Sequence, residues 1–451
     1  MHRIALIYLQ DWIQSPQRKP LVLRGARQVG KTWLAREIAK TSGKQLIELN
    51  FERSPQLKSL FNQNDPTHIL NNISGLQNKT IHPQNSLLFL DEIQAAPEVF
   101  ATLRWFAEEM PELAIIAAGS LLEFMLNEFS FSMPVGRIHY LYVEPLSFEE
   151  FLLADGQEQR LQFLKEYTWQ SEIPDIIHQQ FIMEFKKYLI VGGLPAAVSA
   201  WQETKNIITA QQIQYNLLTT YRDDFNKYAG KLSIMRLDEV LMQTPHLLGE
   251  KFKYSRINSD VQSAAVKAAL KLLIQARICH PIYSCAANGL PLGAEMDIKT
   301  FKVILLDVGL ASIALGLNLQ GIDSINDINF INKGVIAEQV VGQLLRTIQP
   351  PYINPTLYYW NRDKKGSSAE IDYIIQHENG ILPIEVKSGT TGSLKSLHLF
   401  MQLKQLSRAL RINSDKPSLV KVNSHLANGT AVEYQLYSLP FYLLGQIHRL
   451  L

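Results

Sequence analysis

The chain has 451 residues, of which 46% are hydrophobic and 19% are charged. These values exclude extended disorder and, at this length, predict a globular protein of two to four domains. Lys and Arg (44) nearly balance Asp and Glu (42), so any nucleic-acid surface has to be local. With two cysteines, no signal-peptide pattern and no run of roughly 18–20 apolar residues, we expect a cytoplasmic protein without membrane contact.

A strand, a glycine-bearing loop and a helix follow one another in residues 20–40, PLVLRGARQVGKTWLAREIAK. This is the strand–GxxxxGK[ST]–helix context of a phosphate-binding loop. Its glycines let backbone amides curl around phosphate oxygens, and we expect Lys31 to reach the β- and γ-phosphates and Thr32 to hold Mg²⁺. The expected ATP contacts are Gly25, Ala26, Arg27, Gln28, Val29, Gly30, Lys31 and Thr32. The alternative is a loop that binds nothing.

A buried-strand pattern in NSLLFLDEIQ (residues 85–94) ends in two acids. Asp91, at the end of the strand, is expected to orient the water shell of Mg²⁺ and so to count as a metal residue. Glu92 is placed to polarise the attacking water, which makes it the expected catalytic base beside the catalytic Lys31. Alternatively, Glu92 caps the next helix.

Two further residues are candidates for the nucleotide site. The apolar stretch LAIIAAGS (residues 113–120) ends in Ser120, which we expect to contact the γ-phosphate unless it only caps a helix. Arg137 is a candidate transition-state arginine, in the same subunit or in a neighbour, and equally a structural ion-pair partner. Strands near residues 21, 46, 87, 114 and 139, alternating with helices, predict a doubly wound parallel sheet. Ligands of such sheets lie at the carboxyl ends of the strands, where these motifs fall.

Residues 369–389, AEIDYIIQHENGILPIEVKSG, read as two strands joined by the turn HENG. Asp372, Glu385 and Lys387 follow the D–x₁₂–E–x–K spacing of PD-(D/E)xK nucleases. Two carboxylates on adjacent strands can bind Mg²⁺, and a lysine beside them can stabilise charge on a phosphate as a catalytic group. Glu338, in the helical pattern KGVIAEQVVGQLLR, is the expected third metal ligand. The alternative is a nuclease-derived fold kept as a scaffold.

The middle of the chain is helix-rich and then reads as a winged helix. An amphipathic helix at Ser263–Arg277 leads into an apolar strand, CHPIYSC, whose Cys279, His280 and Cys285 do not match the spacing of a zinc site. Basic residues outnumber acids here, which suits phosphate contacts, and the alternative is a solvated face on a purely structural domain. The basic residues are Lys251, Lys253, Arg256, Lys267, Lys271 and Arg277.

Seven motifs occur in one order along the chain: GARQVGKT, FLDEIQ, AAGSLLEF, GRIHYLYVEPLSFEEF, YLIVGGLPAAV, YRDDFNKYA and VILLDVGLA. Together with the C-terminal stretch they resemble the bacterial and archaeal AAA-like ATPases that carry a C-terminal DUF4143 domain. The resemblance covers nearly the whole chain. It implies a P-loop ATPase, a winged-helix-like segment and a restriction-endonuclease-like fold.

The expected protein is therefore an α/β multidomain chain. Its parts are an AAA/ASCE-type P-loop ATPase domain (1–150), a helical lid (151–230), a winged-helix-like segment (231–300) and a DUF4143 nuclease-like domain (301–451). We expect ATP hydrolysis with Mg²⁺, coupled to a C-terminal domain that acts on nucleic acid, DNA in particular. The alternative is a regulatory nucleotide switch whose nuclease-like domain is a non-catalytic platform for DNA or protein. A homo-oligomer is compatible with either function.

Overall fold

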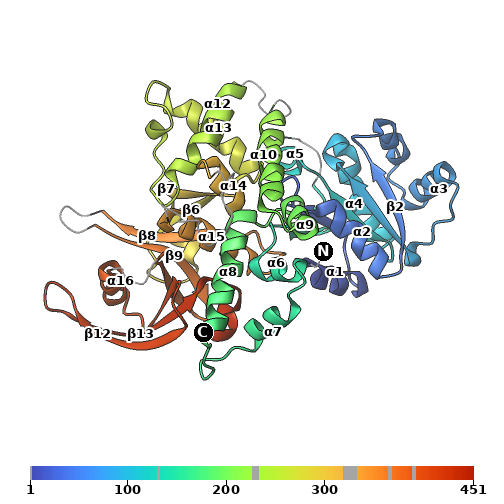
Figure 1. The fold of residues 1–451 in the computed structure, drawn as a ribbon. Helices are drawn as coiled ribbons and strands as arrows, with labels where there is room; N and C mark the ends of the chain where they lie inside the picture. Colours follow the sequence, from blue (N-terminus) through green and yellow to red (C-terminus); the bar gives the residue numbers. More distant parts are fainter. Residues whose placement is uncertain (1–2, 129–132, 226–232, 318–332, 364–367, 389–392) are drawn as a thin grey trace.

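The structure is a computed structural model that describes residues 3–128, 133–225, 233–317, 333–363, 368–388 and 393–451. In these residues the N-terminal sheet has five strands in the order β2-β3-β4-β1-β5, all parallel. They are β1 (Leu21–Arg24), β2 (Gln45–Asn50), β3 (Ser86–Asp91), β4 (Ala114–Ala118) and β5 (His139–Tyr142). Every strand lies where the sequence predicts one, so the parallel sheet is confirmed (Figure 1).

Helices cover both faces of this sheet, because the strands carry apolar side chains on both faces. On one face, Leu21 and Leu23 pack in the same core as α1 (Ala5–Gln14) and α2 (Lys31–Thr41). On the other, Val22 packs in the same core as α3 (Pro66–Gln77) and α4 (Pro97–Glu109). Burial on both faces explains the unbroken apolar run in β3. Each such buried side chain stabilises the fold by roughly 1.5–3 kcal/mol.

Eight α-helices lie between β4 and the second sheet in the described residues, and the expected helix-rich stretch is among them. They are α5 (Leu122–Glu128), α6 (Phe148–Ala154), α7 (Glu158–Glu166), α8 (Asp175–Val191), α9 (Pro195–Thr204), α10 (Ile207–Asp223), α12 (Ile234–Gln243) and α13 (Ser263–Gln275). A capping box begins α6, since Ser147 Oγ accepts from the Glu150 amide and Glu150 Oε2 accepts from the Ser147 amide. The expected boundary at 150/151 falls inside this helix. The one at 230/231 lies outside the described residues.

The second sheet has eight strands among the described residues, in the order β12-β13-β11-β10-β9-β8-β6-β7. They are β6 (Cys279–Cys285), β7 (Met296–Leu305), β8 (Leu357–Arg362), β9 (Ala369–His377), β10 (Gly380–Val386), β11 (Arg408–Asn413), β12 (Ser418–His425) and β13 (Ala431–Pro440). The predicted hairpin is confirmed, because β9 and β10 pair antiparallel.

The winged-helix expectation needs a correction at its strands. The amphipathic helix is present as α13, with Val266, Leu270 and Leu273 buried. The strand after it, β6, pairs in parallel with β8 and antiparallel with β7, so both strands belong to the C-terminal sheet and form no separate wing. The expected boundary at 300/301 falls inside β7.

Four further helices pack with this sheet: α14 (Val308–Ala314), α15 (Lys333–Thr347), α16 (Lys395–Lys404) and α17 (Ile447–Leu450). Short 3-10 helices are η1 (Pro55–Phe61), η2 (Pro83–Asn85), η3 (Ile93–Ala95), η4 (Thr244–Leu247), η5 (Tyr254–Arg256), η6 (Leu292–Glu295) and η8 (Phe441–Gln446). One hydrophobic core joins helices α6 to α10 to this sheet, since Tyr188 of α8 and Val340 of α15 share it. No helix within the described residues is long and apolar enough to cross a membrane.

Candidate functional sites

The phosphate-binding loop runs from β1 into α2 and bends at two glycines. The backbone φ is +149° at Gly25 and +98° at Gly30, where a residue with a Cβ is strained. A Cβ at Gly25 would also lie only 2.4 Å from the carbonyl oxygen of Val143. The loop therefore has the tight curl that the motif predicts.

Lys31 begins α2, and its side chain is buried against its own loop. Its Nζ donates to the carbonyl oxygens of Gly25 (2.9 Å) and Ala26 (2.7 Å). Burial lowers the pKa of Lys31 to about 8, because the ammonium loses its hydration. Its hydrogen-bond partners are neutral carbonyls, which compete weakly with an anionic phosphate for the ammonium.

A cavity of about 310 Å³ lies between the loop and the carboxyl ends of β3 and β4. It brings together the predicted Lys31, Thr32, Asp91, Glu92 and Ser120. The full lining is Arg27, Gln28, Gly30, Lys31, Thr32, Trp33, Asp91, Glu92, Gly119 and Ser120. The loop residues Gly25, Ala26 and Val29, also expected as ATP contacts, are not in this lining; Ala26 and Val29 pack into the core behind the loop.

Asp91 ends β3 and is buried, and its Oδ2 accepts a hydrogen bond from Asn50 Nδ2 at 3.1 Å. Burial, and then the neighbouring Glu92 carboxylate, raise the pKa of Asp91. Carboxylate and hydroxyl oxygens are ligands that Mg²⁺ prefers, and Asp91 and Thr32 line one cavity. The donors present therefore fit the expected Mg²⁺.

Glu92 is held by three hydrogen bonds to its Oε2. The donors are the amide (3.0 Å) and hydroxyl (2.9 Å) of Ser120 and Nε2 of Gln94 (2.6 Å). Although burial opposes the charged form, these bonds lower the pKa of Glu92, so it stays ionised. Glu92 precedes the 3-10 helix η3 without a capping bond from its side chain, which counts against the capping alternative.

Ser120 therefore has a different contact from the one expected. Its hydroxyl and its amide both bind Glu92, which makes it a positioning residue for that carboxylate in this structure. Gln94, which sequence reasoning missed, completes the arrangement. A Cβ at Gly119 would lie 2.0 Å from Gln94 Oε1, so glycine is needed beside Ser120 for the Gln94 side chain to fit.

Arg137 lies outside the cavity lining. Its Nε donates to Glu108 Oε1 at 2.7 Å, and its side chain is 47% exposed. Within one chain it is thus a surface ion-pair partner and no nucleotide contact, because Glu108 of α4 holds it on the outside of the domain.

Arg27 connects the loop to helix α10. Its guanidinium forms an ion pair with Asp224, which directly follows this helix. The Tyr221 hydroxyl donates to the carbonyl oxygen of Arg27 at 2.8 Å. Two residues of the YRDDFNKYA motif therefore contact the backbone and the side chain of one loop residue that lines the cavity.

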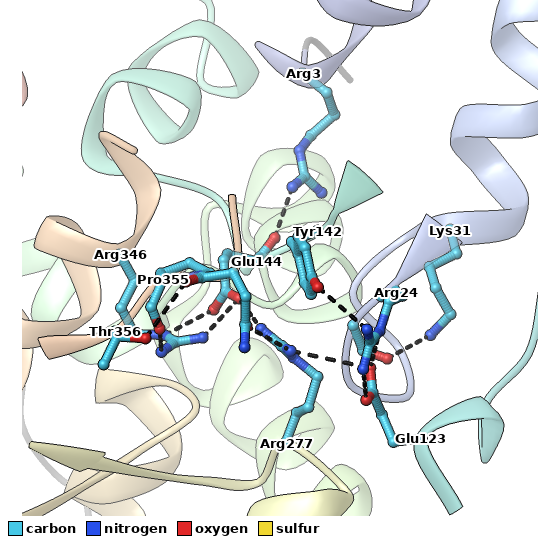
Figure 2. A network of polar contacts seen from close by, with 12 residues as sticks. Arg3, Arg24, Lys31, Glu123, Tyr142, Glu144, Arg277, Arg346, Pro355 and Thr356 are labelled. Atoms are coloured by element: carbon cyan, nitrogen blue, oxygen red, sulfur yellow. Dashed lines mark hydrogen bonds and ion pairs between the residues drawn. The ribbon is translucent and has the colours of Figure 1, made fainter. Parts of the chain in front are cut away.

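A buried ion cluster joins the AAA-like part to the C-terminal part (Figure 2). Glu144, after β5, accepts hydrogen bonds from Arg277 Nη2 and from Arg346 Nη2, both at 2.8 Å. Although burial opposes its charge, Arg346 and Arg277 hold the pKa of Glu144 far below its usual value. Arg346 comes from α15 and Arg277 from the turn between α13 and β6, so Glu144 ties three segments together.

The same cluster reaches the phosphate-binding loop. Arg277 Nη1 lies 3.9 Å from Glu123 Oε1, and Glu123 accepts from Arg24, the last residue of β1. Arg3 donates to the carbonyl oxygens of Val29 in the loop (2.8 Å) and Glu144 (2.7 Å). Sequence reasoning missed these contacts.

The expectation that Arg277 belongs to a basic nucleic-acid surface was wrong, because its side chain is buried in this cluster. Two other members of that basic set are neutralised locally: Lys251 pairs with Asp363 and Arg256 with Glu250.

The C-terminal sheet gathers four carboxylates and two lysines, which we call the carboxylate–lysine centre. Lys387 Nζ donates to Glu385 Oε1 at 2.6 Å, and the Val386 amide donates to Asp372 Oδ2 at 2.7 Å. Lys302 Nζ lies 3.2 Å from Glu338 Oε2 and also pairs with Glu370. The members of this centre are Lys302, Glu338, Glu370, Asp372, Glu385 and Lys387. The motif residues thus come together, with Lys302 and Glu370 as unexpected additions.

A bulge in β9 lies at Asp372. Tyr358 pairs with Ile374 and Trp360 with Ile371, so two residues of β9 stand opposite the single Tyr359 of β8. Such a bulge redirects the side chains beside it. It allows Tyr373 to donate to the carbonyl oxygen of Glu338 at 2.7 Å, which fixes α15 against the strand that carries Asp372.

Burial and mutual repulsion dominate the electrostatics of this centre. Burial raises the pKa of Glu338 to about 8 and that of Glu385 to about 7, with Asp372 adding to both shifts. Burial raises the pKa of Asp372 as well. Lys302 opposes all three shifts, and Lys387 opposes those of Asp372 and Glu385. With every group ionised, four carboxylates against two ammonium groups would leave a net charge of −2.

The donor types fit a divalent cation, and Glu385 Oε2 is buried without a hydrogen-bond partner. The spatial arrangement does not fit yet: across the described chain, no group of three or more His, Cys, Asp and Glu side chains is disposed to hold a metal ion. The two lysines contact Glu338, Glu370 and Glu385, three of the four carboxylates.

Comparisons with known proteins divide the chain into three parts. Residues 17–152 match the family described as an AAA domain, residues 182–321 match a domain of unknown function, DUF8612, and residues 333–429 match a domain of unknown function, DUF4143. The N-terminal part is therefore an ATPase-like AAA domain, and the chain carries DUF4143 after it. No curated protein matches.

Two solved structures are similar in part. The Walker-type ATPase of Pyrococcus abyssi is 15% identical, with 69% of this chain and 94% of that chain covered and a TM-score of 0.42. The ORC2 protein of Aeropyrum pernix, in ADPNP–ADP complexes, is 14% identical, with 61% and 85% covered and a TM-score of 0.33. Both TM-scores are below 0.5, so neither likeness establishes a common overall fold.

Proposed function

We propose that the protein binds and hydrolyses ATP with Mg²⁺ at the phosphate-binding loop. The observation that carries this proposal is one cavity lined by Lys31, Thr32, Asp91 and Glu92 in an AAA-like domain. Bound Mg²⁺ would neutralise phosphate charge there. Lys31 would exchange its carbonyl partners for phosphate oxygens, and Glu92, kept ionised by Gln94 and Ser120, would accept a proton from the attacking water.

The test is phosphate release from ATP by wild type and by Glu92→Gln. A glutamine keeps the size of the side chain and removes the base, so we expect nucleotide affinity to be retained while turnover falls by roughly 10²–10⁴. The matched control is Glu172→Gln, at an exposed position that is not part of the cavity lining. Unchanged turnover in Glu92→Gln would remove Glu92 from the mechanism.

We further propose that the nucleotide state is passed to the rest of the chain through α10. Support comes from Tyr221 and Asp224, which contact the backbone and the side chain of Arg27 beside the cavity. A phosphate that draws Arg27 toward itself would pull on these contacts. Tyr221→Phe removes the hydroxyl alone, and the exposed Tyr215→Phe on the same helix is its control.

Hydrogen exchange with and without a non-hydrolysable ATP analogue measures this coupling. Protection of α10 and α13 should change in wild type and in Tyr215→Phe, and the change should shrink in Tyr221→Phe. Equal responses in all three proteins would contradict the coupling through α10.

For the C-terminal domain we propose metal-dependent action on nucleic acid, DNA in particular. The orphaned oxygen of Glu385, with Asp372 and Lys387 beside it, favours a site that takes up a cation and a phosphate. Glu338, Asp372 and Glu385 would hold the metal, and Lys387 would stabilise charge on the phosphate. In a homo-oligomer the half-exposed Arg137 would be free to approach a neighbour's nucleotide, although it pairs with Glu108 within its own chain.

The alternative is a nucleotide switch whose DUF4143 domain is a binding platform without catalysis. The observation that favours it is the pairing of carboxylates with Lys302 and Lys387. Paired carboxylates are stabilised as a structural core and need no cation.

A cleavage assay separates these two functions. End-labelled single-stranded, duplex and branched DNA and RNA are incubated with Mg²⁺ or Mn²⁺, with and without ATP. Wild type is compared with Asp372→Ala, Lys387→Ala and the exposed control Lys395→Ala. Cleavage lost only in the first two variants supports the nuclease, and ATP dependence supports gating. ATP hydrolysis without any cleavage supports the platform.

A further inference from the structure

A buried lysine of the carboxylate–lysine centre comes from outside the D–x₁₂–E–x–K motif. Lys302 lies on β7 in the apolar run FKVILL, and only 1% of its surface is exposed. Its Nζ is 5.3 Å from the centre of the Tyr359 ring. A buried ammonium without partners would be strongly destabilising, so the position requires acidic partners.

Those partners are two of the four carboxylates. Lys302 Nζ pairs with Glu338 Oε2 at 3.2 Å and with Glu370 Oε1. Two carboxylates therefore share one buried ammonium, and one of them is Glu338, the carboxylate that α15 contributes.

The other two expected metal ligands have different contacts. Glu385 has one oxygen paired with Lys387 and the other buried without a partner. Asp372 is bound by the Val386 amide, and no ammonium hydrogen bond to it is present among the described contacts. Glu338 is thus the expected ligand whose ammonium partner comes from outside the motif.

We propose that Lys302 is an internal counter-ion that competes with a divalent cation for Glu338, so that the cation binds weakly until this ion pair opens. The proposal rests on the metal-binding part of the proposed function. It explains why carboxylates that suit a divalent cation lie close together and yet are not arranged as a metal site. The competing interaction is electrostatic, and β7 supplies it from a strand that the motif does not include.

The experiment measures Mn²⁺ alone, by titration calorimetry on the full chain without nucleotide or nucleic acid. Lys302→Met removes the ammonium and keeps an unbranched side chain. We expect Mn²⁺ to bind this variant at least about tenfold more tightly than wild type, because a positive charge next to a ligand is gone. The matched control is Lys251→Met, which removes the same charge from an exposed ion pair with Asp363 and should leave affinity unchanged.

A double variant shows whether Glu338 is the contested ligand. The tighter binding should disappear in Lys302→Met combined with Glu338→Gln. If Lys302→Met does not fold, Lys302→Gln keeps a hydrogen-bond donor for Glu338 and answers the same question. An independent measurement is the rise in melting temperature that Mn²⁺ causes. A larger rise in either Lys302 variant than in wild type supports the proposal.

Failure of this proposal is distinct from failure of the nuclease. Equal Mn²⁺ affinity in wild type, Lys302→Met and Lys302→Gln would overturn the counter-ion role of Lys302, whether or not the wild type cuts DNA. Tighter Mn²⁺ binding without cleavage by any variant would support the counter-ion and contradict the nuclease alone. No Mn²⁺ binding by any of these proteins would overturn both.

Discussion

The phosphate-binding loop and the carboxylate–lysine centre both combine buried acids with a lysine, yet they hold their charges differently. Lys31 donates to neutral carbonyl oxygens, and burial lowers its pKa to about 8. Lys302 and Lys387 contact carboxylates that raise their pKa values, although burial opposes this. A lysine on carbonyls is ready for an anionic ligand, whereas a lysine on carboxylates already has its counter-ions.

The difference follows from what builds each site. Backbone groups and strand ends form the site at the phosphate-binding loop, so its polar groups are in place before a ligand arrives. Side chains from α15 and three strands form the second, so its internal ion pairs have to open before a cation can enter. This comparison leads us to expect a constitutively competent nucleotide site and a restrained second site.

The largest expected effect is on the ion cluster between the two regions. Glu144→Gln would leave the buried guanidinium of Arg346 without its charged partner and that of Arg277 with Glu123 alone, at 3.9 Å. We expect a loss of roughly 3–5 kcal/mol in the free energy of unfolding, measured by urea denaturation. The control is the exposed Glu172→Gln. A loss equal to that of the control would show that the two regions are stable without Glu144.

At the nucleotide site, Lys31→Ala should lower ATP turnover by roughly 10²–10³, because a charge that stabilises the transferred phosphate is removed. Lys40→Ala, at an exposed position of the same helix, is the control. Phosphate release measures both. If the two variants lose activity equally, the proposed role of the buried lysine is wrong.

The second site should respond to pH. The pKa of Glu338 rises from 4.5 to about 8, so the native state holds this proton more tightly than the unfolded chain. The resulting stabilisation is complete below about pH 4.5 and is lost as the pH rises through 8. Wild type should lose about 4 kcal/mol of this stabilisation between about pH 5 and 9, and Glu338→Gln should not show this loss. Urea denaturation at each pH measures the free energy of unfolding of both proteins. If it changes with pH equally in wild type and Glu338→Gln, the raised pKa of Glu338 is contradicted.

A smaller effect is expected at Ser120. Ser120→Ala removes the hydroxyl bond to Glu92 and keeps the bonds from the Ser120 backbone amide and from Gln94. We expect turnover to fall by about tenfold or more, since a hydrogen bond to a charged group contributes roughly 1.5–3 kcal/mol. ATP affinity, measured by titration of a fluorescent analogue, should stay within about twofold. A large drop in affinity would instead favour the direct γ-phosphate contact first expected for this serine.

The smallest effect is expected at Arg137. Its ion pair with Glu108 is exposed, so Arg137→Ala should change stability by less than about 1 kcal/mol. Turnover measured over a range of protein concentrations tests the other possibility. A loss of activity confined to concentrations at which the protein self-associates would identify Arg137 as a residue that acts in a neighbouring subunit.

The amino-acid sequence alone determined the local features of both regions. The five parallel strands, the loop before α2, the helix α13 and the hairpin of β9 and β10 depend on periodicity, glycine and short spacing, which are visible within about twenty residues. Such patterns report which face of an element is buried. They also placed Lys31, Thr32, Asp91 and Glu92 correctly around one cavity, because parallel strands end at a shared edge.

Only the tertiary structure decided the partners of the buried charges. Glu144 and Arg346 are 202 positions apart, and Ser120 and Glu92 are 28 apart. The run FKVILL indicates that Lys302 is buried and needs a partner, but no local pattern says that Glu338 and Glu370 provide it. The same holds for β6 and β7, whose sequence resembles a wing while β8 draws them into the C-terminal sheet. Burial is encoded locally, whereas the pairing of charges and of sheet edges depends on which distant segments the fold brings into contact.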